Sequence, residues 1–135
     1  MMDYLSYCDE LLQSSSDERI SRRELAAFSA MDGLNTNQMY NVLLAIIRSS
    51  SAVDGEVSPE EAKIHNRVLA ENLDLAQFEA LCQNGDSPTY LANVARMINS
   101  LPESTLEACV ALVCATLVCD GPLKEKERAF LLNFH

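Results

Sequence analysis

One segment near the carboxyl end of the chain constrains the fold more than any other. From Leu106 to Cys119 the only charged residue is Glu107, and the last 12 residues of this segment, Ala108–Cys119, carry no charge. A helix needs roughly 18 to 20 apolar residues to cross a bilayer, so this one is too short. A helix that is apolar on every side must be surrounded by other elements. We therefore expect it to form the buried centre of a helical bundle.

The rest of the chain also has helical patterning. Apolar residues recur at three- and four-residue spacing between short clusters of Ser, Asp, Gly and Pro, and the two-residue alternation of a half-buried strand is not found. This predicts an all-α fold of about eight helices in a compact bundle. The predicted starts are Asp3, Ser21, Asn35 or Thr36, Ser58, Asp74, Ser87, Leu106 and the residues after Pro122.

Several of these starts carry capping signals. A Ser or Asp before an apolar-periodic run accepts a hydrogen bond from an otherwise unpaired N–H group, and a proline is favoured at the next position. Such N-caps are predicted at Ser58, Asp74 and Ser87, and capping boxes at Ser21–Glu24 and Ser104–Glu107. The third helix is expected to fade into Ser49–Ser51.

The charge of the chain is strongly negative and unevenly spread. Twenty acidic residues against ten basic ones give a formal net charge of −10, which repels phosphate backbones, so nucleic acid is disfavoured as a partner. Residues 54–86 hold eight acids against only Lys63 and Arg67. Such a surface attracts divalent cations or a basic protein surface, although it also serves solubility.

Cysteine and histidine usage bears on compartment and chemistry. The five cysteines form no CxxC pair and no disulfide framework, and the first residues resemble no secretion signal, so a reducing, cytoplasmic location is expected. There are two histidines. His65 follows Glu61 by four residues and could pair with it on one helical face, but no catalytic constellation or phosphate loop accompanies them. The chain is predicted not to be an enzyme.

An internal repeat appears at an offset of 66 residues. Val53–Val57 aligns with Cys119–Leu123, and Glu61 aligns with Glu127. Each copy contains an apolar helix, an Asp-Gly pair, an aliphatic residue, a Glu and an amphipathic helix. We therefore expect two pseudo-symmetric helix-loop-helix halves joined at equivalent bends.

At these residues the sequence resembles the TerB-like family, named for bacterial tellurite-resistance proteins and also found as a domain of a membrane-anchored J-domain cochaperone. Ala52–Glu61 and the weaker copy Val118–Glu127 are similar to its pattern A-D-G-x-aliphatic-x-x-x-E. The resemblance covers roughly residues 25–134. It implies one helical domain over residues 1–135, with N-terminal helices at 3–32, repeat halves at about 35–84 and 87–135, and a role in stress or metal-ion response.

The resemblance also implies metal ligands. The acidic residues suspected of binding metal in the family map onto Asp54, Glu61, Asp120 and Glu127. The second copy departs from the pattern, with Cys119 in place of the usual Ala and Lys126 where the first copy has Glu60. Neither bend alone supplies the oxygen ligands of an EF-hand loop. A Ca²⁺ or Mg²⁺ site shared by both bends, with four carboxylates, is the stronger form of the hypothesis.

A purely structural role is the alternative for the same residues. In it, the two Asp side chains make turns to the backbone, Gly55 and Gly121 adopt positive φ, and the two Glu side chains cover unpaired N–H groups of the following helices.

Three functions are weighed. The first is a non-catalytic cytoplasmic stress-response or regulatory module whose acidic surface, including Glu56, Glu60 and His65, binds a protein partner, with a divalent cation as an optional further ligand. The second is a plain protein-interaction or assembly domain that uses an apolar groove and no metal. The third is an enzyme using His65 and nearby acids, which would need a deep pocket. Direct membrane insertion is not expected.

Overall fold

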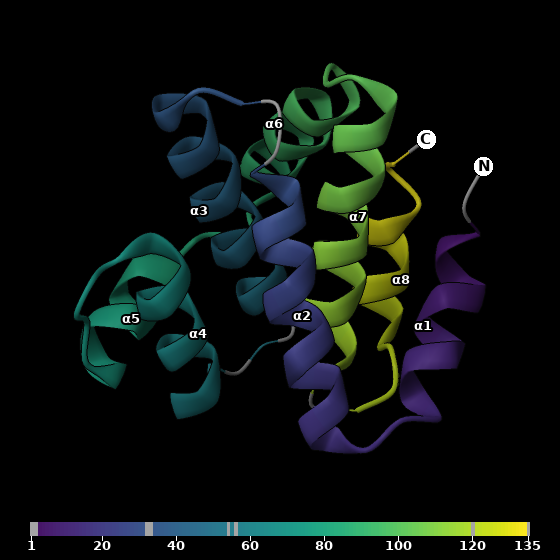
Figure 1. Cartoon of the computed structure of the whole chain (residues 1–135), viewed down its shortest axis with the longest axis horizontal. Helices are drawn as coiled ribbons and strands as arrows, with labels where there is room; N and C mark the ends of the chain where they lie inside the picture. Colours follow the sequence, from purple (N-terminus) through teal and green to yellow (C-terminus); the bar gives the residue numbers. More distant parts are fainter. Residues whose placement is uncertain (1–2, 32–33, 54, 56, 120, 135) are drawn as a thin grey trace.

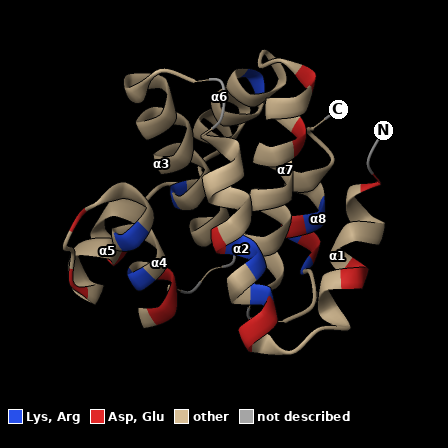
Figure 2. Cartoon of the chain, viewed as in Figure 1, with Lys and Arg blue, Asp and Glu red and all other residues tan. Residues whose placement is uncertain are grey.

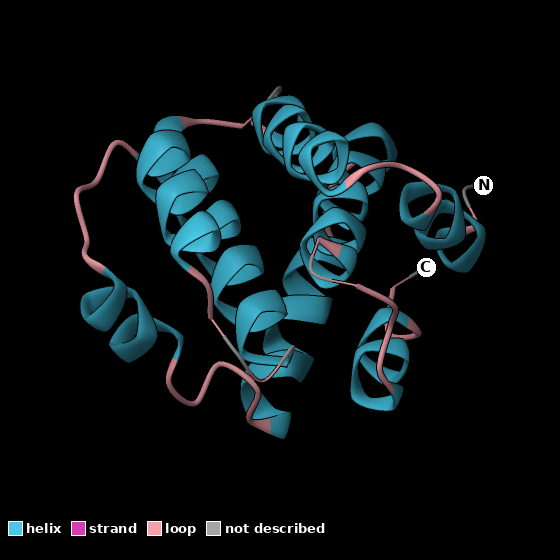
Figure 3. Ribbon diagram, turned by 90° about the horizontal axis from the view of Figure 1, so that it is seen from below, coloured by secondary structure: helices cyan, strands magenta, loops and turns pink. Residues whose placement is uncertain are grey.

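The computed structural model describes residues 3–31, 34–53, 55, 57–119 and 121–134, and these residues form eight α-helices and no strand (Figures 1 and 3). The predicted all-α class is therefore confirmed. The helices are α1 (Tyr4–Leu12), α2 (Ser16–Ala30), α3 (Thr36–Val53), α4 (Pro59–Leu69), α5 (Leu75–Cys82), α6 (Pro88–Asn99), α7 (Glu103–Val118) and α8 (Glu125–Leu131).

Helix α7 is the centre of the bundle. Eleven of its sixteen residues are buried, and it contacts α1, α2, α3, α6 and α8. Its length and all-round apolar surface produce this placement, because only a helix covered on every side can bury such a sequence. In the described part of the chain, no helix is long and apolar enough to span a membrane.

The two bends of the repeat have similar local structure in the described residues. Helices α4 and α8 begin at Pro59 and Glu125, which stand at the 66-residue offset seen in the sequence. Before each of them a glycine has positive φ, 86° at Gly55 and 146° at Gly121. The Gly55 N–H donates to Ala52 O at 3.1 Å, and the Gly121 N–H donates to Val118 O at 3.2 Å. In Figure 1, α3 and α7 run in the same direction, so both lead to the same end of the bundle.

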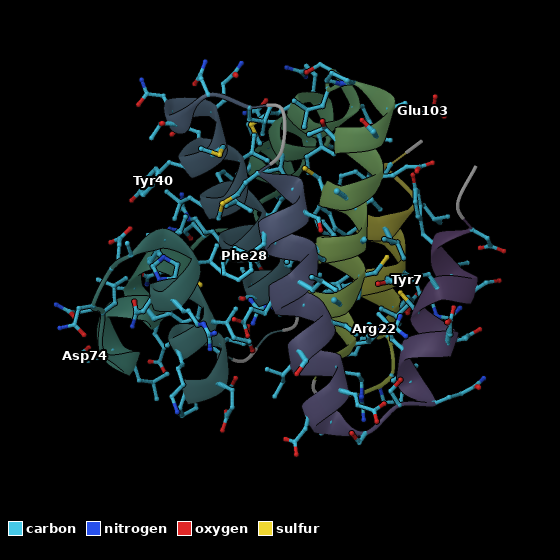
Figure 4. The ribbon with its side chains drawn as sticks, viewed as in Figure 1. Tyr7, Arg22, Phe28, Tyr40, Asp74 and Glu103 are labelled. Carbon is cyan, nitrogen blue, oxygen red and sulfur yellow. The ribbon has the colours of Figure 1, made fainter. Side chains whose placement is uncertain are left out.

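The N-terminal helices cover α7. Helix α2 runs antiparallel to α3 and α7 and makes its main contact with α7, while α1 packs on the other side of α7 (Figure 1). Tyr7 of α1 and Arg22 of α2 lie near each other (Figure 4), and Arg22 hydrogen-bonds the Tyr7 side chain. Burial nevertheless raises the pKa of the Tyr7 hydroxyl.

Capping was predicted correctly at three helices and incorrectly at two. Ser58, Asp74 and Ser87 are N-caps as expected. Helix α2 begins five residues earlier than Ser21, because the Ser15 hydroxyl accepts the Glu18 N–H at 3.2 Å. The Ser104–Glu107 capping box is wrong, since α7 starts directly after Pro102 with no side-chain cap.

The sequence predicted that the third helix would fade into the serine run, but the run does not interrupt α3. Ser49, Ser50 and Ser51 are all fully buried, and α3 continues to Val53. The Ser49 hydroxyl donates to Ala45 O at 2.7 Å, in the preceding turn. A serine that bonds to its own helix in this way can lie in a helix interior.

The central role of α7 predicts the stability of a matched pair of leucine variants. Leu112 of α7 is fully buried, whereas Leu132, just after α8, is 75% exposed. Leu112→Ala should lower the free energy of unfolding by about 2–5 kcal/mol, because it leaves a cavity in the core. Leu132→Ala should change it by less than about 0.5 kcal/mol. Urea denaturation followed by circular dichroism measures both, and equal losses would contradict a central α7.

Candidate functional site

Glu61 and Glu127 occupy equivalent, buried positions. Each is the third residue of its helix, α4 or α8, and they are 1% and 0% exposed. The Lys124 N–H donates to Glu127 Oε1 at 2.7 Å. At the other bend, the Ser58 hydroxyl donates to Glu61 Oε1 at 3.3 Å and accepts the Glu61 N–H at 3.2 Å. The Glu127 carboxylate therefore caps a backbone N–H at the start of α8, whereas the Glu61 carboxylate accepts from the Ser58 hydroxyl that caps α4.

The remaining members of the predicted metal site lie outside the described residues. These are Asp54 and Asp120, and the same is true of Glu56, which was expected on the partner surface. Within the described ranges, no three His, Cys, Asp or Glu side chains gather closely enough to hold a metal ion. The shared four-carboxylate site is therefore still a prediction. The two described carboxylates, Glu61 and Glu127, accept hydrogen bonds at the starts of α4 and α8.

A buried arginine lies near this end of the bundle. Arg23 of α2 is 0% exposed, and its Nε donates to Thr116 Oγ1 at 2.9 Å, while Thr116 donates to Leu112 O at 2.8 Å. One turn earlier, Arg19 Nη1 donates to Val118 O at 3.0 Å. Helix α2 thus directs two guanidinium groups toward the last turn of α7. There the carbonyl ends of the helix favour positive charge.

The charges of Arg23 and Glu61 both act on the pKa of one thiol, that of Cys82. The pKa of Cys82 is raised to about 12, first by burial and then by the negative charge of Glu61, while the positive charges of Arg48 and Arg23 oppose the rise. The Cys82 thiol therefore stays protonated at neutral pH, and a protonated thiol is a poor nucleophile.

No sequence rule singled out Arg23. It stands on α2 in the same stripe as Ala26, Ala27 and Ala30, and all four are buried. An arginine among small buried residues is the signal that could have revealed an inward-pointing charge, because small neighbours leave room for a long side chain.

His65 does not lie on the partner surface, where it was expected. It is 0% exposed, its ring lies 5.3 Å from that of Phe78 between centroids, and Nδ1 is 3.2 Å from Asn66 Oδ1. The four-residue spacing from Glu61 does put both on one helical face, but that face is the buried one. Glu60 lies on the exposed face of α4.

A surface cavity of about 480 Å³ lies where α3 ends and α5 leads into α6. Its lining includes two exposed carboxylates, Glu79 and Asp86, together with the buried Cys82. The other residues that line it are Ser51, Ala52, Gly55, Val57, Gln83 and Asn84, so its described lining has no basic side chain. We call it the acidic cavity. Glu79 and Asp86 belong to different segments, so no spacing in the sequence pairs them.

Gly85 allows the turn between α5 and α6 to pack closely against α3. A Cβ atom at Gly85 would lie 2.8 Å from Arg48 O and 3.0 Å from Ala52 Cβ, so only glycine fits. Arg48 fixes the same turn, because its Nη2 donates to Gln83 O at 2.9 Å and its guanidinium carbon lies 4.6 Å from the centre of the Tyr90 ring. This close approach places Asp86 beside the end of α3.

A second cavity, of about 440 Å³, shares Asp86 with the first. Its lining is mainly apolar and comes from α3, α6 and α8; we call it the apolar cavity. The residues are Val53, Asp86, Pro88, Leu91, Lys126, Ala129, Phe130 and Asn133.

Comparison with protein-family models, with curated proteins and with solved structures gives no match to this chain. The resemblance to the TerB-like family therefore rests on the two repeat motifs alone, and what it implies about function belongs to the proposal below.

The close packing at Gly85 predicts a strong effect of a small substitution. Gly85→Ala should lower the free energy of unfolding by about 1–3 kcal/mol, because the new methyl group is forced against the α3 backbone. Ala80→Gly, at an exposed position of α5, serves as the control and should cost about 1 kcal/mol from helix propensity alone. Thermal unfolding measures both, and a Gly85→Ala variant as stable as the wild type would refute the close approach.

The buried guanidinium predicts a second contrast, between neighbouring arginines. Arg23→Met should destabilise the chain by about 1–3 kcal/mol, because it removes a buried hydrogen bond and leaves Thr116 without its donor. Arg22 is exposed, so Arg22→Met should cost no more than about 1 kcal/mol. Chemical denaturation measures the free energy of unfolding of both variants, and equal stabilities would show that the buried bond from Arg23 to Thr116 contributes nothing.

Proposed function

We propose that this chain is a non-catalytic regulatory module of the TerB-like, stress-response type, and that its acidic surface binds a basic protein partner. The acidic cavity is the observation that carries the proposal. It brings the carboxylates of Glu79 and Asp86 together in a concave surface with no basic side chain in its described lining. Concave surfaces lined by one sign of charge concentrate ligands of the opposite sign.

The charge around the cavity supports the same reading. Acidic residues lie on α4 and around α5, at the left of Figure 2, with few basic residues between them. Residues 54–86 contain only two basic residues, and one of them, Arg67, pairs with Glu24 at 2.7 Å. Its positive charge is therefore offset, and the surface is left with its excess of carboxylates.

The compartment in this proposal is the cytoplasm. All five cysteines are free thiols and are buried, which agrees with a reducing environment. The candidate ion for such a module is Ca²⁺ or Mg²⁺ at the two bends, with Asp54, Glu61, Asp120 and Glu127 as the ligands that the resemblance implies. The hydrogen bonds that Glu61 accepts from Ser58 and that Glu127 accepts from Lys124 compete with such an ion for the same carboxylates.

An assembly domain without metal is the second candidate. The apolar cavity favours it, because it is an exposed concavity with an apolar lining on the surface formed by α6 and α8. Such a concavity can receive an apolar side chain of a partner. The third hypothesis, an enzyme based on His65, loses its basis, since His65 is fully buried against Phe78.

Binding of a defined basic probe tests the main proposal. Hexalysine carrying a fluorophore should bind the wild-type chain, and Glu79→Gln/Asp86→Asn should weaken this binding about tenfold, since each exposed charge pair contributes about 0.5–1 kcal/mol. Asp9→Asn/Glu10→Gln removes the same charge from the exposed surface of α1 and should have little effect. Fluorescence anisotropy at two salt concentrations measures this. Equal weakening by both double variants would mean that only net charge matters.

The cation hypothesis has its own test. Calorimetric titration with Ca²⁺, Mg²⁺, Mn²⁺ and Zn²⁺ should give heat and a raised melting temperature with Ca²⁺ or Mg²⁺, and Asp54→Ala and Glu61→Ala should abolish both effects. The opposite pattern is no heat with any ion, together with a loss of roughly 1 kcal/mol of stability in each variant, as for a lost cap. That pattern would assign these residues to the structure alone.

A further inference from the structure

We infer that the acidic and apolar cavities form one two-part docking site, which receives a partner segment carrying a basic residue next to an aliphatic or aromatic one. This inference rests on the proposed function and names the class of partner. It joins two features of the surface that would otherwise be separate hypotheses, a charged binding face and an apolar groove.

The two cavities share one lining residue and both reach the end of α3. Asp86 lines both of them, and the end of α3 contributes Ala52 to the acidic cavity and Val53 to the apolar one. Their volumes, about 480 and 440 Å³, both fall within the range of small-ligand pockets, roughly 300–1,000 Å³. Each can therefore hold a side chain of a short segment that crosses the Asp86 carboxylate.

The apolar part has the character of an anchor pocket. Phe130, only 2% exposed, contributes part of its lining, and Pro88 and Leu91 of α6 add further apolar surface. An aliphatic or aromatic side chain that enters such a pocket loses its contact with water and acts as a hot spot of binding. On the acidic side, Glu79 and Asp86 lie within reach of a lysine or arginine beside that anchor.

The charge pattern decides between possible occupants. A second copy of this chain carries the same net charge of −10 and is repelled, and nucleic acid is repelled for the same reason. A basic and apolar protein segment is attracted by the acidic cavity and retained by the apolar one. Lys126 lines the apolar cavity and repels a basic residue there, so the basic residue of the partner segment is expected at the acidic cavity.

The relative position of the two cavities is also fixed before a partner binds. The bond from Arg48 to Gln83 O and the close contact at Gly85 hold the α5–α6 turn on α3, so the two cavities keep their relation without a partner. A preformed site loses less conformational entropy on binding than a disordered one.

Three fluorescent peptides of equal length test the inference on the full chain. The first carries two lysines followed by a leucine, the second replaces the leucine by serine, and the third replaces the lysines by serine. We expect the first to bind about tenfold more tightly than the second, because burial of a leucine contributes at least about 1.4 kcal/mol. We expect a similar difference from the third, because that peptide lacks the lysines that the acidic cavity attracts. Anisotropy titration gives the three dissociation constants.

Two tyrosine variants locate the leucine. Ala129→Tyr fills the apolar cavity from an exposed position of α8 without a change of charge, and it should reduce binding of the first peptide to the level of the second. Ala92→Tyr, at an exposed position of α6 outside both linings, is the matched control and should leave all three affinities unchanged. Circular dichroism checks that both variants fold.

The outcomes separate this inference from the function on which it rests. If the two lysine peptides bind equally and Ala129→Tyr has no effect, the two-part site is wrong while binding by the acidic surface stands. If neither lysine peptide binds, the proposed function itself fails. A concentration-dependent dimer in sedimentation that Ala129→Tyr abolishes would assign the apolar cavity to a second copy of the chain and overturn the inference.

Discussion

The burial of α7 is the constraint on which the rest of the molecule depends. Its sequence is apolar on every side, so every face must be covered, and α1, α2, α3, α6 and α8 supply the cover. This covering brings the other half of the repeat, α3, alongside α7, and places both bends at one end of the bundle. The chemistry at that end, with Arg19 and Arg23 directed at the last turn of α7, follows from the same packing.

Charge is handled differently inside the molecule and on its surface. Near the bends, Arg23, Glu61 and Glu127 are all buried, and the polar bonds around them belong to helix caps and to Thr116. A buried charged group is costly to leave without hydrogen-bond partners, so these bonds matter to the stability of the bundle. On the surface, the carboxylates of Glu79 and Asp86 have no basic neighbour in the described lining of their cavity. Buried polar groups thus bond to the helix starts, while these two carboxylates are exposed to solvent.

Much of the local structure could be predicted because it depends on residues close together in the chain. The N-caps at Ser58 and Ser87 need only a hydroxyl and the N–H group three residues later. The failures have local reasons as well. The Ser104 signal was overridden because α7 begins at Glu103, immediately after Pro102. The Ser49–Ser51 run stayed helical with all three side chains buried, and the Ser49 hydroxyl bonds to Ala45 O of the same helix. His65 was misplaced because its spacing from Glu61 defines a helical face without saying whether that face is buried.

By itself the sequence determined the all-α class, the central helix, the 66-residue repeat and the positive φ of the glycines at the bends, because periodicity and turn chemistry act over a few residues. Tertiary structure alone decided which charges are buried and which side chains share a cavity. Glu79 and Asp86 line one cavity beside the end of α3, where Gly85 lets two backbones approach closely, and Arg23 reaches Thr116 across 93 residues of chain. Contacts between residues far apart in the chain depend on how the helices pack, and a short sequence pattern does not determine that packing.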